Sequence, residues 1–428
     1  MKQLFTLSVL LFSFFQIAFS QQILLDPSFG DNGIVKTDMG SPFNYSNIGK
    51  QVLVQSDGSI YMVFEGNGPS GFGISYPTMI AKILSNGAAD LSYGHNGFSV
   101  PLPIFSSHAA MQADGKIIVA GSVSNPDQYY NETDFAVARL NTDGSLDNSF
   151  GENGIQIVDM KQYDNITSVA IQSDGKIVVA GNTNTNTSTA PTYDPSQRIP
   201  IVLFRFTQDG SLDNTFNGNR IIAYTNGSAY SIAIGGDGKI VVAGRVGDKA
   251  SVIRYNQDGS FDPGFDGSGL SIMGFTSSDE INSIAIQNDG KIVAAGYKKN
   301  GNTYDFAVVR FTSDGSPDAT FNENGRQLTD FGGANDTSIC VAIQSDGKIV
   351  LAGYSSSGGN TNFAICRYNS DGSLDNTFNT NGKQTTDFGS ASGYANSLGV
   401  QADGKLVVLG YKNDGVKSEV AAARYSAD

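Results

Sequence analysis

The sequence predicts an all-β protein, a seven-bladed β-propeller of four-stranded antiparallel blades that is closed into a ring by an N-terminal strand. The first observation is a stretch that recurs seven times, with Gln172–Gly181 (QSDGKIVVAG) as its clearest copy. A nearly constant period over most of a chain indicates a repeat architecture. The second observation is that each repeat carries four short β-type segments, and the third is that no helical periodicity appears beyond the N-terminus. The turn glycines lie 57, 60, 63, 52, 57 and 57 residues apart, at Gly58, Gly115, Gly175, Gly238, Gly290, Gly347 and Gly404.

The first two strands of each repeat are predicted from the recurring stretch. In the clearest copy, Ser168–Gln172 precedes an Asp-Gly turn and Lys176–Ala180 follows it. Asp-Gly between alternating apolar residues is a strong hairpin signal, because glycine adopts positive φ without strain. Both segments are short and rich in β-branched residues, which favours strands. We expect Gly181 to end the second strand.

A third and a fourth strand follow a loop of variable length. Asp134–Leu140 and Asp305–Phe311 are typical third strands, and each leads into a second turn block such as Asn141–Gly154. Ile155–Met160 and Lys383–Phe388 are then predicted as fourth strands. The fourth strand is more polar than the others, which suits the edge of a sheet.

The two ends of the repeat region complement each other. Ile23–Gly33 matches the second turn block without a third strand before it, and Val420–Tyr425 is a third strand without a block after it. We therefore expect Ile34–Met39 to be the outer strand of the last blade, which removes an open edge. The alternative places Ile34–Met39 innermost in the first blade, and its polar character favours the outer position.

Composition and the N-terminus indicate where the protein acts. Met1–Ser20 combines Lys2, an apolar run and small residues before Gln21, which is typical of a cleaved signal peptide. A membrane anchor is the alternative, but the run is short and interrupted by polar residues. We expect residues 21–428 to form a single propeller that is secreted or held at the cell surface. The formal net charge of −14 disfavours nucleic acid, and no other segment is long and apolar enough to span a membrane.

The alternation of the two motifs resembles a known family. Gln-x-Asp-Gly-Lys-Ile-x-x-Ala-Gly and Arg-x-x-x-Asp-Gly-Ser-Leu-Asp-x-x-Phe follow each other in register over roughly residues 23–428. This pattern is similar to the delta-60 repeat β-propeller family, which occurs mainly in secreted or surface proteins of bacteria. The resemblance implies a propeller fold, and it implies no settled activity and no catalytic residues.

The acidic turn blocks and the arginines have a structural and a functional interpretation each. Asn141-x-Asp143-Gly-Ser145-x-Asp147 spaces oxygen ligands as calcium loops do, but it lacks the final bidentate glutamate, and Asx turns explain the same residues. Arginines close the third strands, with Lys82 in the first repeat, and could form an anion-binding ring. Pairing with the neighbouring aspartates is expected instead. The arginines are Arg139, Arg205, Arg254, Arg310, Arg367 and Arg424.

Histidine and cysteine offer little chemistry. His95 lies in a turn and His108 just before an innermost strand, without metal-ligand spacing. Cys340 and Cys366 fall on the first and third strands of one blade, about two strand spacings of ~4.8 Å apart, which exceeds the reach of a disulfide. We expect two buried free thiols.

The two faces of the ring differ in sequence. One face, here the uniform face, carries the Asp-Gly hairpins and the Leu-Asp-x-x-Phe loops. The other, here the variable face, carries the loops after each Ala-Gly and the loops that lead into each first strand, and variable loops commonly carry function. Tyrosine and acidic residues recur there, and we expect a ligand to lean toward the first three blades. The ligand-binding candidates are Tyr76, Tyr130, Tyr193, Tyr230, Asp279, Glu280 and Tyr394.

These observations favour a secreted binding or scaffolding module for a protein or a glycan. We expect a monomer that needs no cofactor or metal. The alternative is a secreted hydrolase or lyase, which would require two carboxylates to converge at the channel mouth, such as Asp279 or Glu280 facing Asp164 or Asp336. A purely structural surface protein is the third hypothesis.

Overall fold

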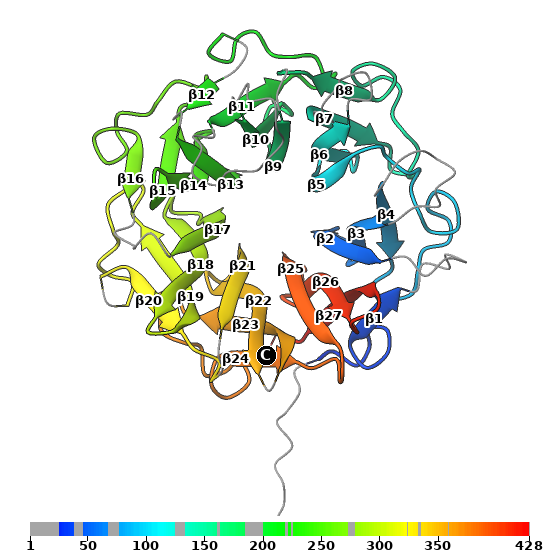
Figure 1. Cartoon of the computed structure of the whole chain (residues 1–428), viewed down its shortest axis with the longest axis vertical. Coiled ribbons are helices and arrows are strands. Elements are labelled where there is room, and N and C mark those ends of the chain that lie inside the picture. Colours follow the sequence, from blue (N-terminus) through cyan, green and yellow to red (C-terminus); the bar gives the residue numbers. More distant parts are fainter. Residues whose placement is uncertain are drawn as a thin grey trace, which may run out of the picture.

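The computed structural model contains β-strands and turns, and no helix occurs among the residues it describes. The strands belong to antiparallel sheets arranged around a common centre, and one edge strand of each sheet lies innermost (Figure 1). The predicted all-β class of four-stranded antiparallel sheets is confirmed. The structure describes residues 25–37, 46–66, 77–124, 133–160, 163–184, 200–218, 221–223, 226–272, 279–322, 324–332, 335–357 and 359–427.

The first half of the chain forms three groups of strands. The first contains β2 (Asn47–Val54), β3 (Ile60–Gly66) and β4 (Thr78–Ile83). The second contains β5 (Phe105–Met111), β6 (Ile117–Ser124), β7 (Thr133–Leu140) and β8 (Ile155–Val158). The third contains β9 (Tyr163–Ile171), β10 (Ile177–Asn184), β11 (Ile201–Phe206) and β12 (Ile221–Ala223). A single parallel pair, Thr133 with Tyr163, links the second and third groups into one larger sheet.

The second half forms four-stranded sheets in the same order. The first of them contains β13 (Gly227–Ile234), β14 (Ile240–Val246), β15 (Lys249–Tyr255) and β16 (Leu270–Ile272). The second contains β17 (Glu280–Ile286), β18 (Ile292–Asn300), β19 (Thr303–Phe311) and β20 (Arg326–Thr329). The next contains β21 (Asp336–Ile343), β22 (Ile349–Ser357), β23 (Asn360–Tyr368) and β24 (Lys383–Thr386). The last contains β25 (Ser392–Val400), β26 (Leu406–Asn413), β27 (Ser418–Tyr425) and β1 (Ile34–Thr37). The polar fourth strands lie at sheet edges, as predicted.

The two ends of the chain meet in that last sheet. β1 pairs with β27 in antiparallel register, from Ile34 opposite Ala423 to Thr37 opposite Val420. This pairing makes β1 an outer strand and rules out the alternative that residues 34–39 lie innermost, while residues 38 and 39 fall outside the described residues. Phe29 packs in the same core cluster as Val420 and Val407. The N-terminal turn block therefore completes a sheet whose other strands come from the C-terminus.

A β-bulge in the innermost strand explains the glycine of each Ala-Gly pair. β13 shifts register between Ala229 and Ser231, directly opposite Gly244 on β14. A Cβ on Gly244 would lie 1.9 Å from the backbone oxygen of Ser228. The same shift occurs opposite Gly181, where β10 continues to Asn184. The expectation that Gly181 ends its strand is wrong, because the glycine makes room for the bulge and the strand runs on.

The core lies between neighbouring sheets. One cluster, for example, packs Ile118 and Phe135 of the second group of strands against Val179 and Phe204 of the third. The innermost strands contact one another in the succession β2, β5, β9, β13, β17, β21 and β25, and β25 contacts β2. In the part of the chain that the structure describes, no helix has the length and apolar character needed to cross a bilayer.

Candidate functional site

The uniform face is occupied by interactions that hold neighbouring sheets together. Arg139 at the end of β7 donates from Nε to Oδ2 of Asp147 at 2.7 Å and from Nη1 to the backbone oxygen of Gln208 in the next sheet. Its guanidinium also lies 4.8 Å from the ring centre of Phe150. The predicted use of the arginines in ion pairs is confirmed for Arg139–Asp147, Arg205–Asp213, Arg254–Asp262, Arg310–Asp318, Arg367–Asp375 and Arg424–Asp26, with Lys82–Asp90 in the first repeat.

The acidic turn blocks on this face use their carboxylates locally. Oδ1 of Asp143 accepts hydrogen bonds from the backbone nitrogen of Ser145 at 2.9 Å and from its hydroxyl at 2.6 Å. These two hydrogen bonds from Ser145 hold the pKa of Asp143 below its ordinary value. The Asx-turn interpretation of the block is confirmed, and the uniform face offers few uncommitted side chains.

The variable face carries a cluster of tyrosines around one glutamate. The bulge of β13 projects Tyr230, and Glu280 begins β17 opposite Tyr297 of β18. The hydroxyl of Tyr230 donates to Oε1 of Glu280 at 3.0 Å, and the hydroxyl of Tyr297 donates to Oε2. Tyr304 packs edge-on against Tyr297, with ring centres 5.2 Å apart. Two of the predicted site residues, Tyr230 and Glu280, are thus in direct contact.

Electrostatics keeps these phenols protonated. Burial, followed by the charge of Glu280, raises the pKa of Tyr230. Burial and the hydrogen bond to Glu280 raise the pKa of Tyr297 as well. Arg245 Nη1 lies 3.8 Å from Oε1 of Glu280. The cluster therefore presents phenol oxygens, a carboxylate acceptor, a cationic group and aromatic ring faces. All five side chains, including Tyr304, are half-buried.

A second aromatic cluster contains the third predicted residue, Tyr394. Its ring stacks on Tyr411 of β26 with centres 5.1 Å apart and meets Tyr354 of β22 edge-on at 5.3 Å. All three rings are half-buried. Tyr297, Tyr354 and Tyr411 each directly follow the glycine of an Ala-Gly or Leu-Gly pair, in three successive repeats. Sequence reasoning did not select these tyrosines, although their shared position after that glycine was a usable signal.

The other predicted site residues differ in their surroundings. Asp279 is fully buried, and its Oδ1 accepts a hydrogen bond from the backbone nitrogen of Lys299 at 2.8 Å, so it supports the loop. Tyr76, Tyr130 and Tyr193 lie outside the described residues, and the expected lean toward the first three blades stays a prediction. The described tyrosine clusters belong to the sheets of the second half.

The histidines and cysteines add no reactive group to this face. His108 lies within β5, where it was expected just before the strand, and burial lowers its pKa to about 4. Exposed His95 lies in a turn. Cys340 and Cys366 are free thiols, as predicted; Cys366 is buried as expected, whereas Cys340 is half-buried. Burial raises the pKa of each thiol to about 12.

Comparison with known proteins supports the fold. Five segments, residues 112–150, 172–192, 235–265, 287–321 and 344–378, match the family model described as "Domain of unknown function (DUF5122) beta-propeller". No curated protein matches the sequence. The chain is similar to the solved structure of an ulvan lyase, from a new family of polysaccharide lyases, bound to -[GlcA(1-4)Rha3S]-. The TM-score is 0.52 at 12% identity, over 90% of this chain and 96% of the lyase.

Two further solved structures show similar coverage. A second ulvan lyase structure gives a TM-score of 0.51 at 12% identity, over 90% of this chain and 96% of that one. A protein of unknown function from Dyadobacter fermentans gives 0.49 at 12% identity, over 92% of this chain and 98% of that one. At these identities the two lyase structures inform on the fold alone. The matched segments and the repeated antiparallel sheets together support a β-propeller fold built from repeats.

Proposed function

We propose that the sheets form a seven-bladed ring closed by β1, and that the chain is a secreted, non-enzymatic propeller that binds a glycan on its variable face. The pairing of β1 with β27 and the succession of contacts from β2 to β25 and back to β2 support the ring. The pattern of Met1–Ser20 supports export.

Binding rests on one observation, the half-buried tyrosines whose hydroxyls are tied to Glu280. Tyrosine supplies a large flat surface at low entropic cost together with a polar tip, which suits the faces and hydroxyls of sugar rings. A carboxylate already oriented by Tyr230 and Tyr297 needs little reorganisation before it accepts hydrogen bonds from a ligand. Tyr354, Tyr394 and Tyr411 extend the same chemistry to the neighbouring sheets.

The hydrolase or lyase alternative requires carboxylates that converge and face solvent. Asp164, Asp279 and Asp336 are fully buried, and each accepts a hydrogen bond from a backbone nitrogen at a different sheet junction. Glu280 is the partly exposed carboxylate of the residues considered for catalysis. This burial favours binding over hydrolysis by those residues, and product analysis tests it directly.

The experiment uses the chain from Gln21 to Asp428 and a panel of neutral and acidic oligosaccharides, followed by calorimetric titration of the best binder. Tyr394→Ala and Glu280→Gln are the test variants. Leu91→Ala is the control, because Leu91 is 70% exposed in a turn block of the uniform face. We expect each test variant to weaken binding about tenfold, or about 1.4 kcal/mol, and the control to bind normally.

Unchanged affinity in both test variants would contradict the site. Shortened or unsaturated oligosaccharides after incubation with the wild-type chain would replace the binding role with the enzymatic alternative. Binding of a protein partner but no oligosaccharide would reject the glycan and leave the protein-binding alternative.

A further inference from the structure

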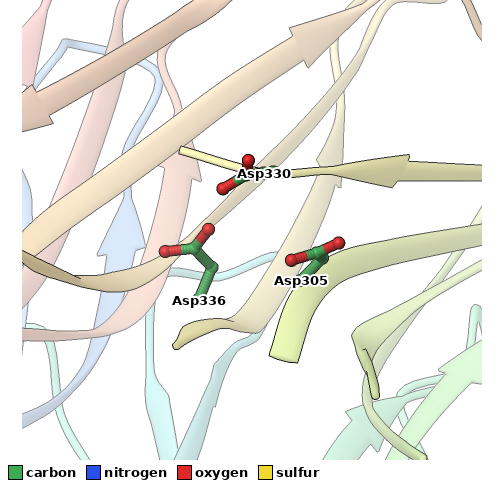
Figure 2. A group of neighbouring side chains, drawn as sticks. All are labelled: Asp305, Asp330 and Asp336. Atoms are coloured by element: carbon green, nitrogen blue, oxygen red, sulfur yellow. The ribbon is translucent and has the colours of Figure 1, made fainter. Parts of the chain in front are cut away.

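Three aspartates from consecutive elements meet at one sheet junction, separate from the tyrosine clusters. Asp305 lies on β19, Asp330 directly follows β20, and Asp336 begins β21 of the next sheet. One carboxylate oxygen of each lies within 4.8 Å of those of the other two. Figure 2 shows the three carboxyl groups gathered around a common space. A parallel bridge between Tyr304 and Asn335 holds the two sheets together here.

Each aspartate accepts a hydrogen bond from a group close to it in the chain. The side-chain nitrogen of Asn300 donates to Oδ2 of Asp305 at 2.8 Å, and the backbone nitrogen of Gly332 donates to Oδ1 of Asp330 at 2.6 Å. The backbone nitrogen of Phe331 donates to Oδ2 of Asp336 at 2.8 Å. These contacts fix the positions of the carboxylates and leave further oxygens available to a ligand.

The burial of the Asp336 carboxylate is the observation that indicates a ligand. Asp336 is 0% exposed, and its Oδ1 is buried without a hydrogen-bond partner among the residues that the structure describes. Its carboxyl group faces those of Asp305 and Asp330 (Figure 2). A buried carboxylate oxygen without a partner is costly unless something compensates it.

The protein's own cations do not supply that compensation. Asp318 and Asp375 on the uniform face each pair with an arginine and a lysine, whereas no ion pair to the three clustered carboxylates occurs within the described ranges. The ammonium group of Lys383 donates at 2.8 Å to the backbone oxygen of Asp330 rather than to its carboxylate.

The repeats provide an internal comparison. Asp336 stands eleven residues before the turn glycine Gly347, and Asp164 stands eleven before Gly175. Asp164 is also fully buried, and its Oδ1 accepts no hydrogen bond from the residues that the structure describes. Asp134 and Asp159 occupy the positions of Asp305 and Asp330. The following repeat has Asn362 and Gly393 where the cluster has Asp305 and Asp336, and keeps only Asp387 in the place of Asp330. The three positions thus carry aspartate together at particular junctions, while other junctions lack the set.

We propose that Asp305, Asp330 and Asp336 bind a divalent cation, Ca²⁺, that fastens β19 and β20 to β21. Oxygen-only ligands select hard cations over zinc, and Ca²⁺ accepts irregular arrangements of carboxylates with backbone oxygens and water completing its shell. The site is distinct from the Asp-Gly turn blocks, whose carboxylates are engaged by their own turns. It acts by cross-linking two sheets beneath the variable face and takes no part in contacting a glycan.

Terbium luminescence tests the proposal on the chain from Gln21 to Asp428 after treatment with a chelator. Tb³⁺ replaces Ca²⁺ in oxygen sites, and because the sequence contains no tryptophan, any sensitised emission comes from tyrosine. Tyr304 adjoins Asp305 and is well placed to sensitise a bound ion. Ca²⁺ should displace Tb³⁺, with Mg²⁺ far less effective.

Asp330→Asn and Asp336→Asn are the test variants, and Asp387→Asn is the matched control. Asp387 is exposed and accepts a hydrogen bond from the backbone nitrogen of Gly389 at 2.8 Å, just as Asp330 accepts one from Gly332. The positions equivalent to Asp305 and Asp336 in this repeat carry no carboxylate. Each test variant should lose one equivalent of calcium or bind it at least about tenfold more weakly, while the control equals wild type. Because Asp330 is exposed, its variant decides the outcome if Asp336→Asn fails to fold.

Thermal unfolding measures calcium binding independently of luminescence. Calcium binds the folded chain and should raise the melting temperature of wild type and of Asp387→Asn, with a smaller or no rise in Asp330→Asn. The proposal is wrong if wild type binds neither Tb³⁺ nor Ca²⁺, if Mg²⁺ competes as well as Ca²⁺, or if Asp330→Asn and Asp387→Asn respond alike.

Discussion

Replacing Asp164 with asparagine tests whether a buried carboxylate opposes folding at neutral pH. Asp164 is 0% exposed; its Oδ2 accepts one hydrogen bond, from the backbone nitrogen of Met160 at 3.1 Å, and its Oδ1 has no partner among the described residues. Burial, together with the charges of Asp134 and Asp159, raises its pKa from 3.8 to about 7. The folded chain therefore holds this proton more tightly than the unfolded chain does.

The sign of the effect follows from that shift. A group whose pKa is higher in the folded state stabilises the fold below its unfolded pKa of 3.8, and this contribution is lost as the pH rises through about 7. The pKa therefore rises by about 3. Since one pKa unit corresponds to about 1.4 kcal/mol, the free energy of unfolding loses at most about 4 kcal/mol across this window. Asparagine cannot ionise, so Asp164→Asn lacks this loss.

The assay is urea unfolding of wild type and Asp164→Asn in chelator, at a series of pH values from below 3.8 to above 7. The variant should gain stability relative to wild type as the pH rises. Asp143→Asn is the control for the direction of the pH dependence, because hydrogen bonds from Ser145 lower the pKa of Asp143. At this position wild type should lose stability relative to the variant as the pH falls. A difference between Asp164→Asn and wild type that stays constant across the window would refute the reasoning.

The remaining predictions concern the closure, the bulges and the thiols. Asp26→Asn breaks a buried ion pair with the last strand and should lower the free energy of unfolding by about 3 kcal/mol in urea; an unchanged midpoint would argue against closure by the N-terminal block. Gly244→Ala places a Cβ 1.9 Å from a backbone oxygen and should cost about 3 kcal/mol, whereas Gly236→Ala has no atom within 4 Å and should be tolerated; equal costs would contradict the bulge explanation. Cys340 and Cys366 should both react with a thiol reagent in unreduced, denatured protein and react slowly when folded, while a mass lower by two hydrogen atoms would indicate a disulfide.

The sequence alone was sufficient for the local features that repeat. An Asp-Gly turn needs positive φ at its glycine, and β-branched residues on either side favour extended backbone, so each hairpin could be placed from a few neighbouring residues. The observed β7 (Thr133–Leu140) and β27 (Ser418–Tyr425) differ from the predicted strands by one or two residues at their N-terminal ends. The order of strands followed from the repeat itself, and so did the outer position of residues 34–37.

Contacts between paired strands and between sheets were beyond the reach of sequence reasoning. The bulge that requires Gly181 depends on the backbone of the strand opposite, so the glycine resembled a strand end in the sequence. Tyr230 and Glu280 were selected singly because they stand in variable loops, yet only the packing of β13 against β17 and β18 brings them together with Tyr297. Asp305, Asp330 and Asp336 are spread over three elements and two sheets. Turn chemistry acts between neighbours in the chain and can be predicted from them, whereas hydrogen bonding, burial and charge at a site depend on distances that exist only after the sheets have packed.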